Sequence, residues 1–172
     1  MMKKRAVLMF LALTLSLSLC ACSGKDKALQ KEDLSMTVGE TAVTADSQVS
    51  SLLEAFGADY EMAEAVSCVY TGLERTYSYG NLILYTYPAD DGAEHLMEAY
   101  ASADAKTSRG VAIGSSLKDV EAAYGTDYTK AGNTMTFALA ASGDQMVPAS
   151  IYFELDGDTV TAIGIVAEHR AQ

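Results

Sequence analysis

The sequence is poor in several residue types on which whole classes of protein depend. Its 172 residues include no tryptophan, two prolines, two histidines and three cysteines. Neither His95 nor His169 has a cysteine or histidine at the spacing of a zinc site, and the chain has no Walker loop, Gly-x-Gly-x-x-Gly loop or Gly-x-Ser-x-Gly elbow. The sequence therefore predicts no enzyme, no metal site and no cofactor. A Ser-His-Asp triad stays open as an alternative, because its members need not be adjacent in sequence.

Positive charge is also scarce. The chain has 12 lysines and arginines against 23 aspartates and glutamates, a net charge of −11. Nucleic acids and anionic lipid surfaces both require clustered Lys and Arg, so we expect neither as an electrostatic partner. The acidic balance is typical of a well-solvated protein and could also steer a basic partner toward it.

Residues 1–21 are typical of a targeting segment. Three cations at positions 3–5 precede an apolar run over residues 6–21, which is short for a membrane span. The run ends in Leu19-Cys-Ala-Cys22, which resembles a bacterial lipobox. That resemblance implies cleavage before Cys22, a diacylglyceryl group on its sulfur, and a chain anchored on the extracytoplasmic face of the cell membrane. An ordinary secretory signal is the alternative, and the type of envelope stays open.

Residues 22–35 follow as the lipidated cysteine and a polar, lysine-rich tether. With Cys22 used for lipid and Cys20 in the leader, Cys68 has no cysteine with which to form an internal disulfide. Its neighbours in Val66-Ser-Cys-Val-Tyr70 favour a strand. We therefore expect a buried and unreactive thiol.

One stretch occurs twice in the chain. Aligned without a gap, Ser47 meets Ser115, and Gly57-Ala-Asp-Tyr60 meets Gly125-Thr-Asp-Tyr128. A recurrence of this kind predicts an internal structural repeat.

Each copy predicts a short helix that ends at its glycine. The apolar side chains recur at helical spacing before Gly57 and again before Gly125. Asp46 or Ser47 could cap the first helix, and Ser116 with Asp119 resembles a capping box for the second. The apolar stripes are Val49, Leu52, Leu53 and Phe56 in the first copy, and Leu117, Val120 and Tyr124 in the second.

Strand-like sequence follows each helix. Gly80-Asn81 separates two β-rich runs and predicts a hairpin that pairs Tyr77 with Leu84. Residues 93–103 have the composition of a helix but the position of a third strand, and we favour the strand. The expected strands are residues 66–70, 75–79, 82–88, 93–103, 134–139, 149–155 and 159–167, with short edge runs at 36–38 and 111–113.

These patterns predict an α+β fold of two tandem repeats, residues 36–106 and 107–172, each a short helix packed on a small antiparallel β-meander. The layout resembles the β-lactamase inhibitory protein-like (BLIP-like) fold. Three segments are also similar to small lipoproteins of Gram-positive anaerobes: residues 67–73, 77–79 and 107–114. A related unit occurs in outer-membrane assembly lipoproteins. The inhibitory protein has intradomain disulfides, which this chain has no cysteines to form.

Tyrosines are the remaining candidates for a site. Tyrosine combines contact area with a polar tip and is enriched at interfaces, and the resemblance implies a concave sheet face with aromatic contacts. We therefore expect Tyr77, Tyr79, Tyr85 and Tyr87 to contact a partner, with packing against the helix as the alternative for each. The expected function is a lipid-anchored extracytoplasmic module that binds a protein or an envelope component. An inhibitor of a secreted or envelope enzyme (β-lactamase-like or a peptidase) and a structural or envelope-assembly lipoprotein are the alternatives.

Overall fold

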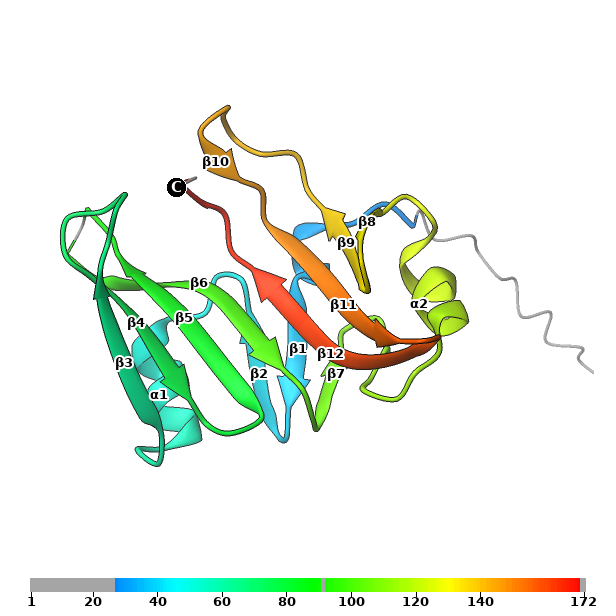
Figure 1. Cartoon of the computed structure of the whole chain (residues 1–172), viewed down its shortest axis with the longest axis horizontal. Helices are drawn as coiled ribbons and strands as arrows, with labels where there is room; N and C mark the ends of the chain where they lie inside the picture. Colours follow the sequence, from blue (N-terminus) through cyan, green and yellow to red (C-terminus); the bar gives the residue numbers. More distant parts are fainter. Residues whose placement is uncertain (1–26, 91, 171–172) are drawn as a thin grey trace, which may run out of the picture.

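A long antiparallel sheet dominates the molecule. The computed structural model describes residues 27–90 and 92–170. Eight strands pair antiparallel across the sheet (Figure 1). Their order is β3 (Glu61–Val66), β4 (Leu73–Ser78), β5 (Leu82–Pro88), β6 (Glu94–Ala101), β12 (Thr159–Val166), β11 (Ser150–Asp156), β9 (Thr134–Ala138) and β8 (Thr129–Ala131).

A second layer lies behind this sheet in Figure 1. It contains helix α1 (Val49–Phe56) and a three-stranded sheet of β2 (Thr41–Thr44), β1 (Ser35–Val38) and β7 (Ala105–Thr107), with α2 (Leu117–Tyr124) at one end. A 3₁₀ turn, η1 (Lys31–Asp33), precedes β1, and β10 (Met146–Val147) pairs with β13 (His169–Arg170). We call the side of the large sheet that meets this layer the covered face, and the opposite side the open face.

The hydrophobic core fills the space between the two layers. Leu84, Phe153 and Ile163 point from the large sheet into one continuous cluster and are fully buried, as is Val43 from β2. Burial of this kind is the main source of the free energy of folding. Because the cluster receives side chains from both halves of the chain, the two halves share one core.

The predicted fold class is wrong. The described chain is mostly β, with two eight-residue α-helices, and the strands after each helix do not form separate meanders. Instead, β6 pairs with β12 from Ala101 opposite Ile163 to Glu98 opposite Val166, which fuses the strands of both halves into one sheet. Local periodicity identifies strands but carries no information on this long-range pairing. The run at 36–38 belongs to the three-stranded sheet rather than to an edge of a meander.

The local predictions for the helices are confirmed in most details. Gly57 and Gly125 end the two helices with φ of 83° and 89°, a region that glycine adopts without strain. Ser116 and Asp119 form the expected capping box at α2. The expected cap of α1 is wrong: the N-cap is Gln48, with no side-chain hydrogen bond.

Most of the strand predictions are also confirmed. Tyr77 pairs with Leu84 across the Gly80-Asn81 turn, and residues 94–101 form strand β6. Two predictions fail: the edge run expected at 111–113 forms only an isolated bridge, between Lys106 and Ala112, and the segment after β3 is not a strand. Strand β3 ends at Val66, and Cys68 lies exposed in the following loop instead of buried in a strand.

The end of the segment assigned to the tether lies against the domain. Leu34 is 1 % exposed and belongs to the core. The Arg109 guanidinium donates to both carboxylate oxygens of Asp33, at 2.7 and 2.5 Å, and also to the backbone carbonyls of Ala28 and Ala123. A bidentate pair of this kind has a fixed geometry, so Arg109 holds residues 28–33 beside the end of α2.

Candidate functional site

The four predicted contact tyrosines lie in different surroundings. Tyr77 points from the covered face of the sheet into the core and is 4 % exposed, so the prediction that it contacts a partner is wrong. Tyr79 packs on Phe56 and donates to the carbonyl of Gly57 at 3.0 Å. Tyr85 lies on the open face with 37 % of its surface exposed. The structure does not bring the four together in one surface.

Tyr87 lies at the far end of β5. Its ring stacks on that of Tyr70, with 4.4 Å between the ring centroids, and His95 lies beside it at 5.7 Å. Both neighbours occupy part of its surface. Tyr87 is therefore one wall of an aromatic cluster rather than a free contact residue.

Tyr77 belongs to a hydrogen-bonded group around Glu94. Its hydroxyl donates to the Glu94 carboxylate at 3.0 Å, and Thr86 and Arg75 donate to the same carboxylate. Burial, reinforced by Glu94, raises the pKa of Tyr77 to about 12. The group satisfies polar atoms at the margin of the core, which is a structural role.

The open face carries two tyrosine–glutamate pairs that the sequence analysis did not single out. Tyr152 on β11 donates to Glu98 on β6, and Tyr100 on β6 donates to Glu154 on β11 at 3.2 Å. Both pairs span the intervening strand β12. Tyr85 lies directly opposite Glu98 in the register of β5 with β6. We call Tyr85, Glu98, Tyr100, Tyr152 and Glu154 the platform.

Gly164 makes this arrangement possible. It lies on β12 directly between Tyr100 and Tyr152 in the strand register. A Cβ atom built on Gly164 would overlap ring atoms of Tyr152. The tyrosine ring therefore lies flat on the backbone of β12, a close approach that a side chain at this position would prevent.

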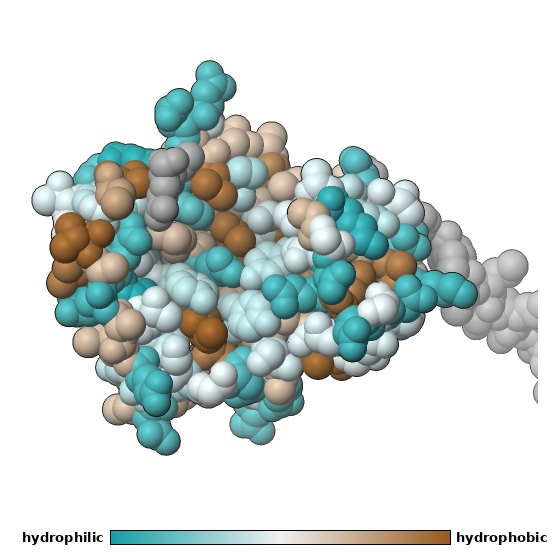
Figure 2. Space-filling view, in the orientation of Figure 1, coloured by the Kyte–Doolittle hydropathy of each residue, from teal (hydrophilic) through white to brown (hydrophobic). Residues whose placement is uncertain are grey.

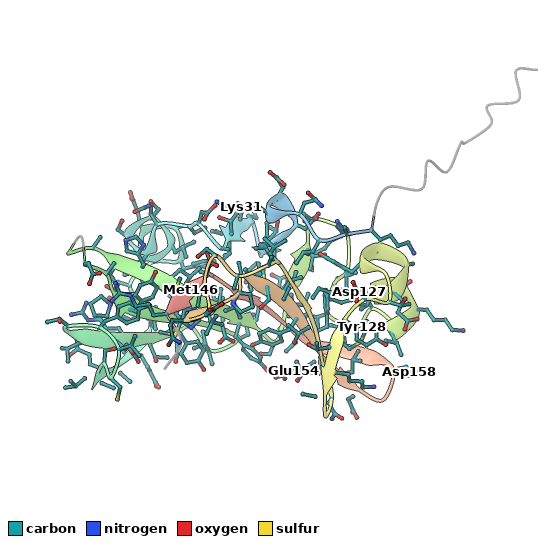
Figure 3. All side chains as sticks on the ribbon, turned by 90° about the horizontal axis from the view of Figure 1, so that it is seen from above. Lys31, Asp127, Tyr128, Met146, Glu154 and Asp158 are labelled. Carbon is teal, nitrogen blue, oxygen red and sulfur yellow. The ribbon has the colours of Figure 1, made fainter. Side chains whose placement is uncertain are left out.

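The platform is polar and acidic. Figure 2 shows pale and teal side chains over the middle of this face, with the most hydrophobic groups scattered. Viewed from above, Glu154 lies on the opposite side of the molecule from Lys31 of the covering layer (Figure 3). Burial raises the pKa of Tyr152 and of Tyr100, and the neighbouring glutamates raise both further, so each phenol keeps its proton and remains a donor.

Strand alternation is the signal that could have revealed the platform. Glu98-Ala-Tyr100 and Tyr152-Phe-Glu154 each place a tyrosine and a glutamate two residues apart, and hence on one face of a strand. What the sequence alone does not reveal is that β6 and β11 lie on either side of β12, close enough for these side chains to meet.

Two expectations concern membranes and metals. Cys22, the expected lipidation site, lies outside the described residues. Within residues 27–90 and 92–170, no helix is both long and apolar enough to cross a membrane. The same described residues place no three His, Cys, Asp or Glu side chains together as metal ligands.

Comparisons with protein-family models, with curated proteins and with solved structures give no match for this chain.

Proposed function

We propose that this chain is a lipid-anchored extracytoplasmic binding module that holds a basic segment of a partner protein on the platform. The observation that carries the proposal is a set of tyrosines and glutamates fixed to one another on a sheet face that neither α-helix nor the three-stranded sheet covers. Tyrosines that hydrogen-bond only to water would not be held in a fixed arrangement of this kind.

The chemistry of the platform favours a partner that presents lysine or arginine. Each glutamate accepts a tyrosine hydrogen bond through one oxygen, Glu98 through Oε1 and Glu154 through Oε2. Its charge therefore remains to attract a cation. The rings of Tyr85, Tyr100 and Tyr152 add contact area and can receive a cation on their faces. Since the side chains are already held in place, binding costs less side-chain entropy.

The charge pattern of the open face supports the same class of partner. The side chains that strand register places on this face in the described sheet include no lysine or arginine. Among them are Thr76, Ser78, Ile83, Tyr85, Glu98, Tyr100, Thr134, Thr136, Tyr152 and Glu154. Complementary charge of this kind speeds encounter and selects partners. The net charge of −11 acts in the same direction at longer range.

The proposed anchor would keep the platform near the membrane. Four residues lie between Cys22 and Lys27, the first described residue, so five Cα–Cα steps join the two. A stretch of that length spans at most about 18 Å. Arg109 fixes the segment that follows, so a lipid on Cys22 would hold the end of α2 close to the bilayer.

A capture experiment with charge-matched variants tests the proposal. The chain from Ser23 onward, which contains every described residue, is immobilised and exposed to envelope extract and culture fluid at low salt. Its platform variant is Glu98→Gln/Glu154→Gln. The control, Glu54→Gln/Asp127→Asn, makes the same charge change at exposed positions on the two helix-bearing ends.

The proposal expects a basic protein that the parent and the control retain and the platform variant loses, and that moderate salt releases from the parent. A protein captured equally by both variants would place the binding site elsewhere. Circular dichroism of the three chains confirms that each is folded.

A further inference from the structure

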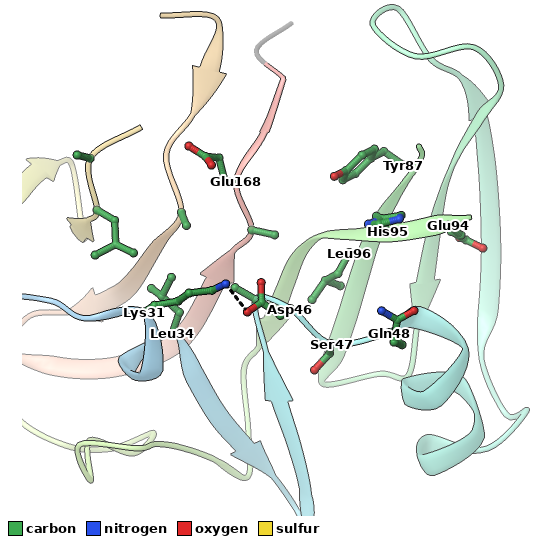
Figure 4. A pocket seen from close by; sticks show the side chains of 15 residues that line it. Lys31, Leu34, Asp46, Ser47, Gln48, Tyr87, Glu94, His95, Leu96 and Glu168 are labelled. Carbon is green, nitrogen blue, oxygen red and sulfur yellow. Dashed lines mark ion pairs between the residues drawn. The ribbon is translucent and has the colours of Figure 1, made fainter. Parts of the chain in front are cut away.

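A pocket opens where the two central strands of the large sheet separate. The pairing of β6 with β12 ends at Glu98 and Val166, and the Ala167 amide makes the last hydrogen bond between them, to the carbonyl of Met97 at 2.9 Å. Beyond this point β6 continues beside β5 to Glu94, whereas the chain after β12 turns to pair with β10. The divergence leaves a cavity of about 510 Å³ between the two halves of the molecule (Figure 4).

The pocket has an apolar floor and one aromatic wall. Leu34, Leu96 and Ala167 are buried beneath it. Tyr87 and His95 stand on one side, opposite Glu168 (Figure 4). The volume is in the range of small-molecule sites, and apolar lining with a few polar groups is typical of them.

Three carboxylates line the pocket, and two of them already have a cation. Asp46 is paired with Lys31 at 2.8 Å, and Glu94 is paired at 3.2 Å with Arg75, which also pairs with Glu64 at 2.7 Å. Glu168 accepts a hydrogen bond from the Ser142 amide and has no cationic partner among the described residues. The unbalanced charge of the pocket is therefore negative, and Glu168 is the lining carboxylate that has no cation of its own among the described residues.

The Lys31–Asp46 pair illustrates the contact that a ligand would make. An ammonium group of the chain itself sits at the rim of the pocket, against a carboxylate (Figure 4). The Asp46 carboxylate raises the pKa of Lys31, which keeps that ammonium charged. The chemistry of the rim thus accommodates a primary ammonium.

From this geometry we infer that the pocket binds a small organic cation: a primary ammonium on an apolar or aromatic body. The ammonium pairs with Glu168, and the body lies over Leu34 and Leu96 beside the ring of Tyr87. Organic anions are disfavoured because they would meet the Glu168 carboxylate. The pocket shares no residue with the platform, so each site can be changed without touching the other.

Titration with a matched pair of probes tests this inference. The folded chain from Ser23 onward, labelled with ¹⁵N, is titrated at neutral pH with 2-phenylethylammonium and, separately, with 2-phenylethanol. The two probes have the same body and differ in charge. We expect saturable shifts at the amides of Leu96, Ala167 and Glu168 with the ammonium, at several-fold lower concentration than with the alcohol.

Three variants assign the effect to the pocket. Glu168→Gln should weaken ammonium binding by about fivefold, the upper range for a solvent-accessible ion pair. Lys31→Met should strengthen it, because it removes a competing cation and frees Asp46. Glu154→Gln, on the platform, should leave it unchanged.

The inference is overturned if the alcohol binds as tightly as the ammonium, if the shifts centre elsewhere, or if none saturates at millimolar concentration. It is also overturned if Glu168→Gln binds as the parent chain does. The platform proposal does not depend on any of these outcomes, because its variants and its readout are separate.

Discussion

Both faces of the large sheet carry tyrosine–glutamate pairs, but the surroundings of these pairs differ. On the covered face, Tyr77 donates to Glu94, and Thr86 and Arg75 complete the group around that carboxylate. On the open face, Tyr152 donates to Glu98 and Tyr100 to Glu154, on strands that flank β12. A tyrosine–glutamate pair therefore has no fixed role. The layer that covers it makes it part of the fold, and the lack of cover makes it available as a surface.

Adjacent residues on β5 should show the largest difference between the faces. Leu84 is fully buried on the covered face, whereas Ile83 is half-buried on the open face. Leu84→Ala should lower the free energy of unfolding by about 2–5 kcal/mol, because it leaves a cavity in the core. Ile83→Ala should cost about 1 kcal/mol or less, since its loss leaves no enclosed cavity. Urea unfolding of both variants measures this, and equal losses would contradict the assignment of the faces.

Gly164→Ala tests whether the open face is under a structural constraint of its own. The new methyl group would force the Tyr152 ring away from β12 and break its bond to Glu98. We expect a loss of about 1–3 kcal/mol, typical of overpacking. Adding Tyr152→Ala removes the ring that clashes, so the double variant should lose less than the two single losses combined. Strict additivity in urea unfolding would show that the ring does not lie on Gly164.

The two faces should also differ in how much a tyrosine hydroxyl contributes to the free energy of unfolding. Tyr77→Phe removes one donor to the partly buried Glu94 and should cost about 1–2 kcal/mol. Tyr100→Phe removes a more accessible hydrogen bond and should cost about 0.5 kcal/mol or less. Chemical denaturation at neutral pH measures both, and the reverse order would contradict the comparison.

Alkaline pH gives a smaller, independent test of Tyr77. Burial raises the pKa of its phenol to about 12, whereas the ordinary value is 10.0. Between these values the unfolded chain loses a proton that the folded chain keeps, so stability falls as the pH rises from about 10 to about 12. Tyr77→Phe should make this fall shallower, and Tyr100 and Tyr152 should account for part of the remainder. The measurement is the melting temperature of the parent chain and of Tyr77→Phe across this pH range. An equal slope of melting temperature against pH in both chains would refute the raised pKa of Tyr77.

Local sequence signals predicted the elements well and their assembly poorly. Gly57, Gly125 and the Ser116–Asp119 box act over four residues or fewer, and the structure confirms them. The fold class depends on the pairing of β6 with β12, whose partners lie more than sixty residues apart. No local propensity encodes that pairing. The prediction of two separate meanders failed at this step.

The candidate site depended on the same missing pairing. Tyr85 was predicted from the hairpin alone, because alternation within β5 is local. Tyr152, Glu98, Glu154 and Gly164 become one surface only after β11, β12 and β6 are placed side by side. Tyr77 and Tyr85 have the same residue type on the same hairpin, and only the covering layer distinguishes their roles.

Site-specific photo-crosslinking tests the claim that the open face is the binding surface most directly. The photoreactive residue p-benzoylphenylalanine replaces Tyr85 on the open face or, as the control, Glu54 on the exposed side of α1. The full chain is irradiated in the cells that produce it. The account predicts one adduct with a basic protein from position 85 and none from position 54. The same adduct from both positions, or an adduct from position 54 alone, would contradict it.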